Sequence, residues 1–125
     1  MATAIRDFEK SFLSTNDLSA AEFLIVAQDT SNDGSVVAAA SATDPILGVL
    51  QNKPKAGESA VVRWGGSTKV IAGGTVTRGA WVTSDSSGHA VSTTTAGNVL
   101  LGRALQSAVS GDIFEVALST FGLHN

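Results

Sequence analysis

Lys55-Ala56-Gly57-Glu58 comes just before the apolar run Ala60-Val61-Val62, and this arrangement of a glycine turn and a short apolar segment returns three times. The later copies are Ile71-Ala72-Gly73-Gly74 before Thr75-Val76, Thr77-Arg78-Gly79-Ala80 before Trp81-Val82, and Val109-Ser110-Gly111-Asp112 before Ile113-Phe114-Glu115-Val116. Glycine suits such turns because they require a positive φ, which is costly for a residue with a Cβ. Short strands at close spacing with this punctuation predict an all-β fold, a small antiparallel β-barrel or sandwich.

The composition fits one folded domain. A chain of 125 residues buries roughly two thirds of its unfolded surface on folding, so we expect it to fold without a metal or a disulfide. Cysteine is absent, which removes disulfide frameworks and thiolate metal sites. Hydrophobic residues make up 43% and charged residues 15% of the chain, which is a globular rather than a disordered composition.

Charge and hydropathy argue against two classes of partner. The formal net charge is -3 and the eight Lys and Arg residues are scattered, whereas affinity for nucleic acid comes mainly from clustered cations. The longest strongly apolar run, Phe23–Ala27, is too short for a membrane-spanning helix. The N-terminal residues also lack the apolar stretch of a cleavable secretion signal. We therefore predict neither a nucleic-acid nor a membrane partner.

Alternating apolar residues and turn residues place further strands along the chain. These are Phe23–Ala27, Ser35–Ala40, Ile46–Gln51, Ala60–Trp64, Ser67–Ile71, Trp81–Ser84 paired with Ala90–Ser92, and Ile113–Leu118. Val99–Leu105 fits a strand or one face of a helix, although Gly102 weakens the helix. Ser119–Asn125 is expected to be a short tail.

The N-terminal residues show a different pattern. Ile5, Phe8 and Phe12 stand at helical spacing among charged residues, which predicts a short amphipathic helix. Because so short a helix is unstable alone, it would dock on its own domain, on a neighbouring subunit or on another protein. We expect residues 1–19 to form an N-terminal arm and residues 20–125 to form a single β domain.

Three groups of residues were weighed as sites of chemistry. Ser84, Asp85 and His89 are a hydroxyl, a carboxylate and an imidazole on one hairpin, but a solvated turn supplies neither a cleft nor an oxyanion hole. The loop Asp29–Gly34 has EF-hand spacing, yet Ala40 stands where a bidentate Glu is required. Gly74 and Gly79 have P-loop spacing without its lysine. We predict no enzymatic activity, no cofactor and no metal site.

The turns and strands are similar in order to those of a known family. The similar segments are Gly48–Gly57, which contains the corner Gln51-Asn52-Lys53-Pro54, Gly66–Gly73, Gly79–Gly88, Leu101–Leu105 and Gly111–Val116. In these segments, within Asp17 to Leu118, the chain resembles the capsid decoration or cement proteins, small head proteins of tailed bacteriophages. The resemblance implies an all-β structural virion protein that binds the outer surface of an assembled head, commonly as a homotrimer, and stiffens the shell.

The resemblance makes the major capsid protein the expected partner, together with further copies of the chain. The family offers no list of binding residues to carry over, so the interface is inferred from apolar residues in the sequence. Trp64 and Trp81 are expected to be core or interface anchors. The expected interface residues are Ile5, Phe8, Phe12, Trp64 and Trp81. The alternative is a β-sandwich module that binds a ligand or a carbohydrate, with Trp64 or Trp81 as a ring-stacking surface.

Overall fold

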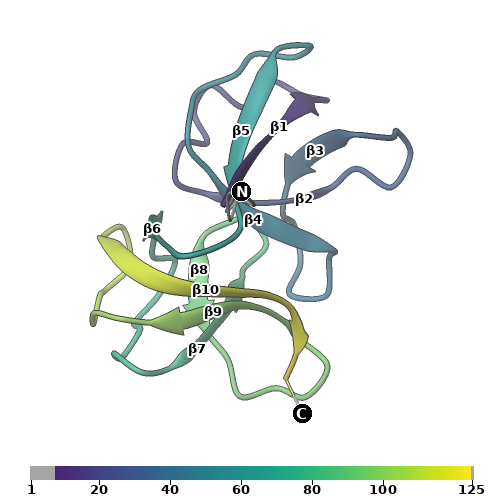
Figure 1. Ribbon diagram of the computed structural model, residues 1–125. Helices are drawn as coiled ribbons and strands as arrows, with labels where there is room; N and C mark the ends of the chain where they lie inside the picture. Colours follow the sequence, from purple (N-terminus) through teal and green to yellow (C-terminus); the bar gives the residue numbers. More distant parts are fainter. Residues whose placement is uncertain (1–7, 125) are drawn as a thin grey trace, which may run out of the picture.

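Five strands form a closed barrel in the computed structural model, which describes residues 8–124 (Figure 1). The strands pair in the order β1-β3-β2-β4-β5, and every pair is antiparallel except β1 with β3. Their bounds are β1 (Glu9–Ser14), β2 (Ile25–Gln28), β3 (Ser35–Ala38), β4 (Ile46–Leu50) and β5 (Ser59–Arg63).

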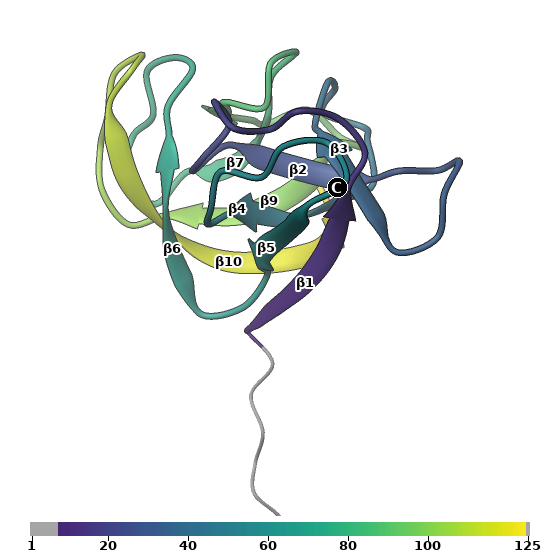
Figure 2. The same cartoon turned by 90° about the horizontal axis from the view of Figure 1, so that it is seen from above.

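The second half of the chain forms an antiparallel five-stranded sheet in the order β6-β10-β9-β7-β8. Its strands are β6 (Ser67–Ile71), β7 (Trp81–Ser84), β8 (Ala90–Ser92), β9 (Val99–Ala104) and β10 (Ile113–Leu123). Figure 2 shows β10 as the long curved strand that passes below the barrel strands β4 and β5 in that view. The predicted all-β fold is confirmed.

The glycine turns behave largely as the sequence predicts. Gly57, Gly79 and Gly111 have φ values of +82°, +87° and +91°, a region that residues with a Cβ rarely occupy. Gly73 is different, because its φ is not positive and a Cβ there would collide with the carboxylate of Asp85. In that copy of the turn, glycine is needed for close approach rather than for its backbone conformation.

The helix predicted around Phe8 and Phe12 is wrong, because these residues enter a strand instead. β1 pairs with β5 from Glu9 to Leu13 and with β3 at Leu13 and Ser14. Positions 8 and 12 lie on one face of a strand as well as near one face of a helix, so their spacing fits both structures. Pairing with β5, about 50 positions later in the chain, decides between them. The segment from Glu9 onward is thus part of the barrel.

Of the two alternatives for Val99–Leu105, the strand is confirmed. Two expectations are corrected. β10 runs on to Leu123 across a bulge instead of ending at Leu118. The strand expected from Phe23 begins at Ile25, because Phe23 itself has a φ of +65°. Two backbone bonds hold Phe23 there: its N–H donates to the Leu50 carbonyl at 2.8 Å and its carbonyl accepts from Ile71 N–H at 3.1 Å.

Two hydrophobic cores stabilise the protein. One fills the barrel and contains the buried side chains Leu18, Ala21, Val26, Val36, Leu47, Leu50, Ala60 and Val62, with Phe12 packed against it. The other lies between the barrel and the second sheet, where Ile25, Ile46 and Val49 meet Val70, Val82, Leu101, Phe114 and Val116. Because the second core takes side chains from both sheets, it joins them into one folded unit.

Candidate interaction surfaces

Three of the predicted interface residues lie together where β1 meets the end of β5. The Trp64 N–H donates to the Phe8 carbonyl at 2.8 Å, and the Phe12 and Trp64 rings meet edge to face with centroids 5.8 Å apart. The Phe8 ring packs over Gly65, where a Cβ would meet it at 2.6 Å. Phe12 is partly buried against the barrel core, whereas Phe8 is 43% exposed. Phe8 is therefore the member of this cluster that offers apolar surface to a partner.

The other two predicted interface residues do not join this cluster. Ile5 lies outside the described residues. Trp81 belongs to β7 in the second sheet, where it is half-buried and pairs in register with Arg103 of β9. The Arg103 guanidinium carbon lies 4.2 Å from the centre of the Trp81 ring, a cation–π contact. Arg103 occupies one face of this ring, so that face is not an open surface for stacking a sugar.

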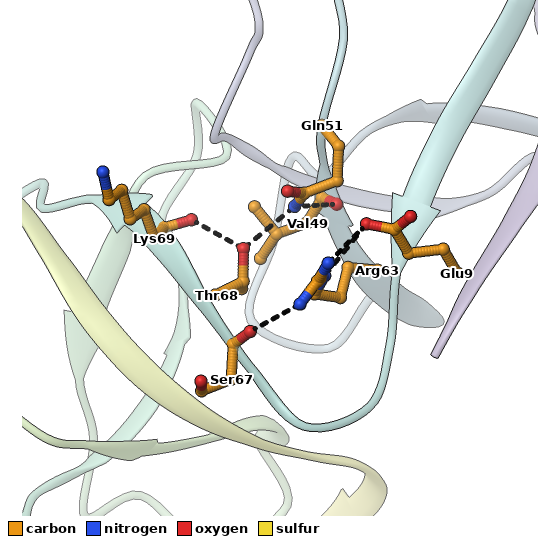
Figure 3. A network of polar contacts seen from close by, with 7 residues as sticks. All are labelled: Glu9, Val49, Gln51, Arg63, Ser67, Thr68 and Lys69. Carbon is orange, nitrogen blue, oxygen red and sulfur yellow. Dashed lines mark hydrogen bonds and ion pairs between the residues drawn. The ribbon is translucent and has the colours of Figure 1, made fainter. Parts of the chain in front are cut away.

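A polar network that the sequence reasoning missed connects the barrel to β6 (Figure 3). Arg63 donates from Nε and Nη2 to Glu9 Oε2 at 3.0 and 2.8 Å, and from Nη1 to the Ser67 carbonyl at 3.2 Å. Gln51 Nε2 donates to the Val49 carbonyl at 3.0 Å and to Thr68 Oγ1 at 2.9 Å. The Arg63–Glu9 ion pair is partly exposed, so its own contribution to stability is about 1 kcal/mol or less.

The hydroxyl, carboxylate and imidazole of the β7–β8 hairpin do not form a catalytic relay. Ser84 is buried and its hydroxyl donates to the backbone carbonyl of Asp85 at 2.8 Å rather than to His89. The hairpin tip is exposed at Ser86 and Ser87, as expected, but Gly88 is buried and its carbonyl accepts from the Ile25 N–H of the barrel at 2.8 Å. This hairpin is a structural contact between the two sheets.

The loop between β2 and β3 uses its acidic residue to fix its own shape. Asp29 accepts hydrogen bonds from the Thr15 hydroxyl at 2.6 Å, the Asn32 amide at 3.0 Å and the Ser31 N–H at 2.9 Å. Residues 8–124 contain no group of three or more His, Cys, Asp or Glu side chains placed to hold a metal ion. The role of Asp29 is therefore to order the loop.

Acid should weaken the fold in part through this carboxylate. The hydrogen bond from Thr15, followed by those from Asn32 and Ser31, lowers the pKa of Asp29 below its ordinary value of 3.8. A lowered folded-state pKa stabilises the fold above the unfolded pKa, and this stabilisation is lost as the pH falls through the folded pKa. We expect the melting temperature to fall as the pH drops below 3.8, and to fall less in Asp29→Asn. Asp33→Asn controls for the loss of a charge. An unchanged slope in Asp29→Asn would contradict this role.

Exposed apolar side chains occur at three places in the described part of the chain. Phe8 and Leu13 lie at β1, Leu105, Val109 and Ile113 lie at the β9–β10 turn, and Leu123 lies at the end of β10. Leu123 borders an open groove of about 290 Å³ whose other lining residues are Gln28, Pro45, Ile46, Leu47, Val99 and Gly122. Of the exposed apolar residues, the sequence predicted only Phe8 as an interface residue. The signal was present at Ile113, because a strand with Phe114 and Val116 facing the core turns Ile113 toward solvent.

The described part of the chain also contains no helix with the length and apolarity needed to cross a bilayer. Its surfaces offer apolar side chains, a ring–guanidinium pair and turns, which suit binding to another protein surface.

The sequence model of the phage cement protein family matches residues 19–119, which include every strand from β2 to β9 and most of β10. Among solved structures, the N base of the head fiber gp8.5 of bacteriophage phi29 is similar in fold. The TM-score is 0.70 with 20% sequence identity, and the match covers 89% of this chain and 92% of that chain. A search of curated protein sequences found no match.

Proposed function

The chain belongs to the phage cement protein family, and we propose that this structural virion protein attaches to the outer surface of an assembled phage head and stabilises it. The observation that carries the proposal is the family match over residues 19–119, which spans both sheets rather than one motif. The likeness to a phage head fiber base in fold agrees with it. The function is a matter of binding alone, without catalysis or a cofactor.

The partner in this proposal is the major capsid protein, and the contact includes the aromatic residues at the start of β1. Phe8 is 43% exposed beside Trp64, and burying such a side chain contributes roughly 1.5 to 3 kcal/mol. Ile5 is a further contact in this proposal, and the half-buried Trp81 adds one from the second sheet. Phe12 contributes to this contact indirectly. It packs on the barrel core and meets the Trp64 ring edge to face, so it fixes the position of Trp64.

The working unit on the head is a homotrimer. One copy offers only small apolar surfaces, and a single weak contact would dissociate quickly. Three linked copies convert the second and third contacts into intramolecular events, which raises the overall affinity without new residues. Closed cyclic symmetry is also the common form of assembly for identical chains.

Binding to heads tests this function directly. Purified protein should sediment with empty heads in a saturable ratio, and saturated heads should release their contents or disassemble at a higher temperature than bare heads. Phe8→Ala should weaken head binding by about tenfold, the equivalent of 1.4 kcal/mol. Leu13→Ala is the matched control, since Leu13 is 49% exposed in the same strand but faces the other side. A protein that never sediments with heads, or that leaves their heat stability unchanged, would refute the proposal.

A further inference from the structure

An exposed apolar patch lies at the β9–β10 turn. Leu105, Val109 and Ile113 are 50%, 57% and 54% exposed. The Leu105 N–H donates to the Glu115 carbonyl at 2.9 Å, so Leu105 lies opposite Glu115 and diagonal to Ile113 on the outward face of the sheet. Ile71 of β6 pairs with Ile113 of β10 and extends the same face. We call Leu105, Val109 and Ile113 the turn patch.

An apolar recess lies at the other end of the same two strands. Val99 begins β9, Leu123 ends β10, and the two residues pair in register. Together with Ile46 and Leu47 of the barrel they line the open groove of about 290 Å³. Antiparallel β9 and β10 therefore carry a protruding apolar surface at their turn and a concave one at their open end. In Figure 1 the turn lies on the left and the C-terminal end at the lower right.

The charges around the two surfaces differ in sign. Lys69 is two residues from Ile71 on the outward face, Arg103 is two residues from Leu105, and the Arg78 N–H donates to Ser107 Oγ beside the patch at 3.0 Å. These are all the Lys and Arg residues between positions 64 and 124. Asp112 and Glu115 also lie there, so three cations stand against two anions.

Two acidic residues and one histidine, His124, adjoin the residues that line the groove. Asp29 adjoins the lining residue Gln28 and Asp44 adjoins Pro45, and no Lys or Arg lines the groove or adjoins a lining residue in the sequence. An apolar patch with one more cation than anions around it and an apolar groove with two acidic neighbours are complementary in charge, and both belong to this chain.

We propose that the turn patch of one copy packs into the groove of a second copy. Two different surfaces at opposite ends of one strand pair form a head-to-tail contact, which closes into a ring when the rotation between copies allows it. The inference rests on the proposed function in that it supplies the contact between the copies of the homotrimer. It leaves Phe8, on the barrel, available for the head.

Site-specific crosslinking tests this contact. Because the chain has no native cysteine, only the introduced thiols react. Val109→Cys and Leu123→Cys each place one thiol, on the patch and at the groove, at exposed positions. With a short bismaleimide linker, a mixture of the two single variants should give covalent dimers that contain one chain of each. The chain with both substitutions should give covalent trimers, and either single variant alone should stay monomeric. The reactions are run free in solution and on saturated heads.

Other results overturn the contact. If Val109→Cys alone links to itself as well as the mixture does, the patch meets a second patch and the head-to-tail arrangement is wrong. If neither the mixture nor the double variant links in solution or on heads, the copies do not meet through these surfaces. A charge inserted in the patch provides a second measurement, with both thiols kept. Leu105→Asp is added to the Val109→Cys chain, and Leu13→Asp added to the same chain is the matched control, since the two leucines are 50% and 49% exposed. Mixed dimers with Leu123→Cys should be lost with Leu105→Asp and kept with Leu13→Asp; equal loss in both, or in neither, contradicts the proposal.

Sedimentation with heads, measured in the same samples, separates the two proposals. If the protein binds heads but its copies do not crosslink, the proposed function is supported and this contact is wrong. Crosslinked trimers that do not bind heads leave the contact standing and remove the function. Full crosslinking of the chain with Leu105→Asp, combined with loss of its head binding, would show that the turn patch receives the capsid protein instead, which also overturns the contact between copies.

Discussion

Removal of residues 1–14 abolishes cooperative folding, whereas removal of residues 1–7 leaves the melting temperature nearly unchanged. We expect this difference because β1, which begins at Glu9, is an integral strand of the barrel and is kept in the shorter truncation. β1 pairs with β5 over five residues and with β3 over two. Without it the edges of β3 and β5 are unpaired and the barrel core opens at Phe12. The loss exceeds about 5 kcal/mol, which is comparable to the whole stability of a small domain.

Thermal unfolding followed by circular dichroism, with a one-dimensional proton spectrum of each truncated protein, measures both effects. An N-terminal arm separate from the β domain, as expected from the sequence, would give the opposite result: a folded domain with weaker head binding. If the chain starting at Thr15 melts cooperatively near the wild-type temperature, β1 is dispensable and the barrel does not need it. Head binding by the chain that starts at Phe8 then reports on the contribution of residues 1–7 separately from folding.

The second large effect is a loss of stability in Gly102→Ala, which adds a single methyl group to β9. Gly102 of β9 faces β10 so closely that a Cβ would collide with the Ala117 carbonyl oxygen, and it would lie 3.0 Å from the Leu118 Cα. These are backbone atoms of a paired strand, which cannot rotate away as the end of a side chain can. Gly102→Ala should therefore cost on the order of 3 kcal/mol or prevent folding, because overpacking is relieved only by shifting the backbone.

Gly74→Ala is the matched control for this substitution. A Cβ at Gly74 would meet only Val91 Cγ1, at 3.8 Å, which is ordinary van der Waals contact. Gly74 also has no positive φ, so the same chemical change should shift the unfolding free energy by less than about 1 kcal/mol. Chemical denaturation of both variants compares them. Equal stability of Gly102→Ala and Gly74→Ala would show that β9 and β10 are not as close as the structure has them.

The turns of the second half were predictable because their chemistry is local. Gly57, Gly79 and Gly111 each follow a small or polar residue and have the positive φ that only glycine adopts easily. These turns can be predicted from neighbouring residues alone, without knowledge of distant contacts. The order of the strands in the two sheets was not predictable, since the parallel pairing of β1 with β3 is set by closure of the barrel.

The N-terminal segment shows where local reasoning fails. The spacing of Phe8 and Phe12 fits two periodicities, and the deciding partner is β5, which is distant in sequence. Phe23 is a similar case, because its φ of +65° reflects bonds to Leu50 and Ile71 that no local pattern encodes.

The proposed interface was predictable only as residue types. Aromatic residues were identified, and the structure brings Phe8, Phe12 and Trp64 together, but Trp81 lies in the other sheet. Exposure depends on which side of a strand faces the core and on what the neighbouring strand carries. Leu105 and Val109 became visible as exposed residues only once β9 and β10 were paired.

The bonds that tie the barrel to β6 also have a consequence for solubility. β6 is an edge strand of its sheet, and an open edge invites pairing with the same strand of another molecule. Near one end the Ser67 carbonyl is occupied by the Arg63 guanidinium, and at the other the Ile71 N–H is occupied by the Phe23 carbonyl. With these two ladder positions filled by its own chain, β6 is a poor template for sheet-to-sheet aggregation. A free copy is thus protected at this edge from pairing with β6 of another copy, which leaves side chains as the means of contact there.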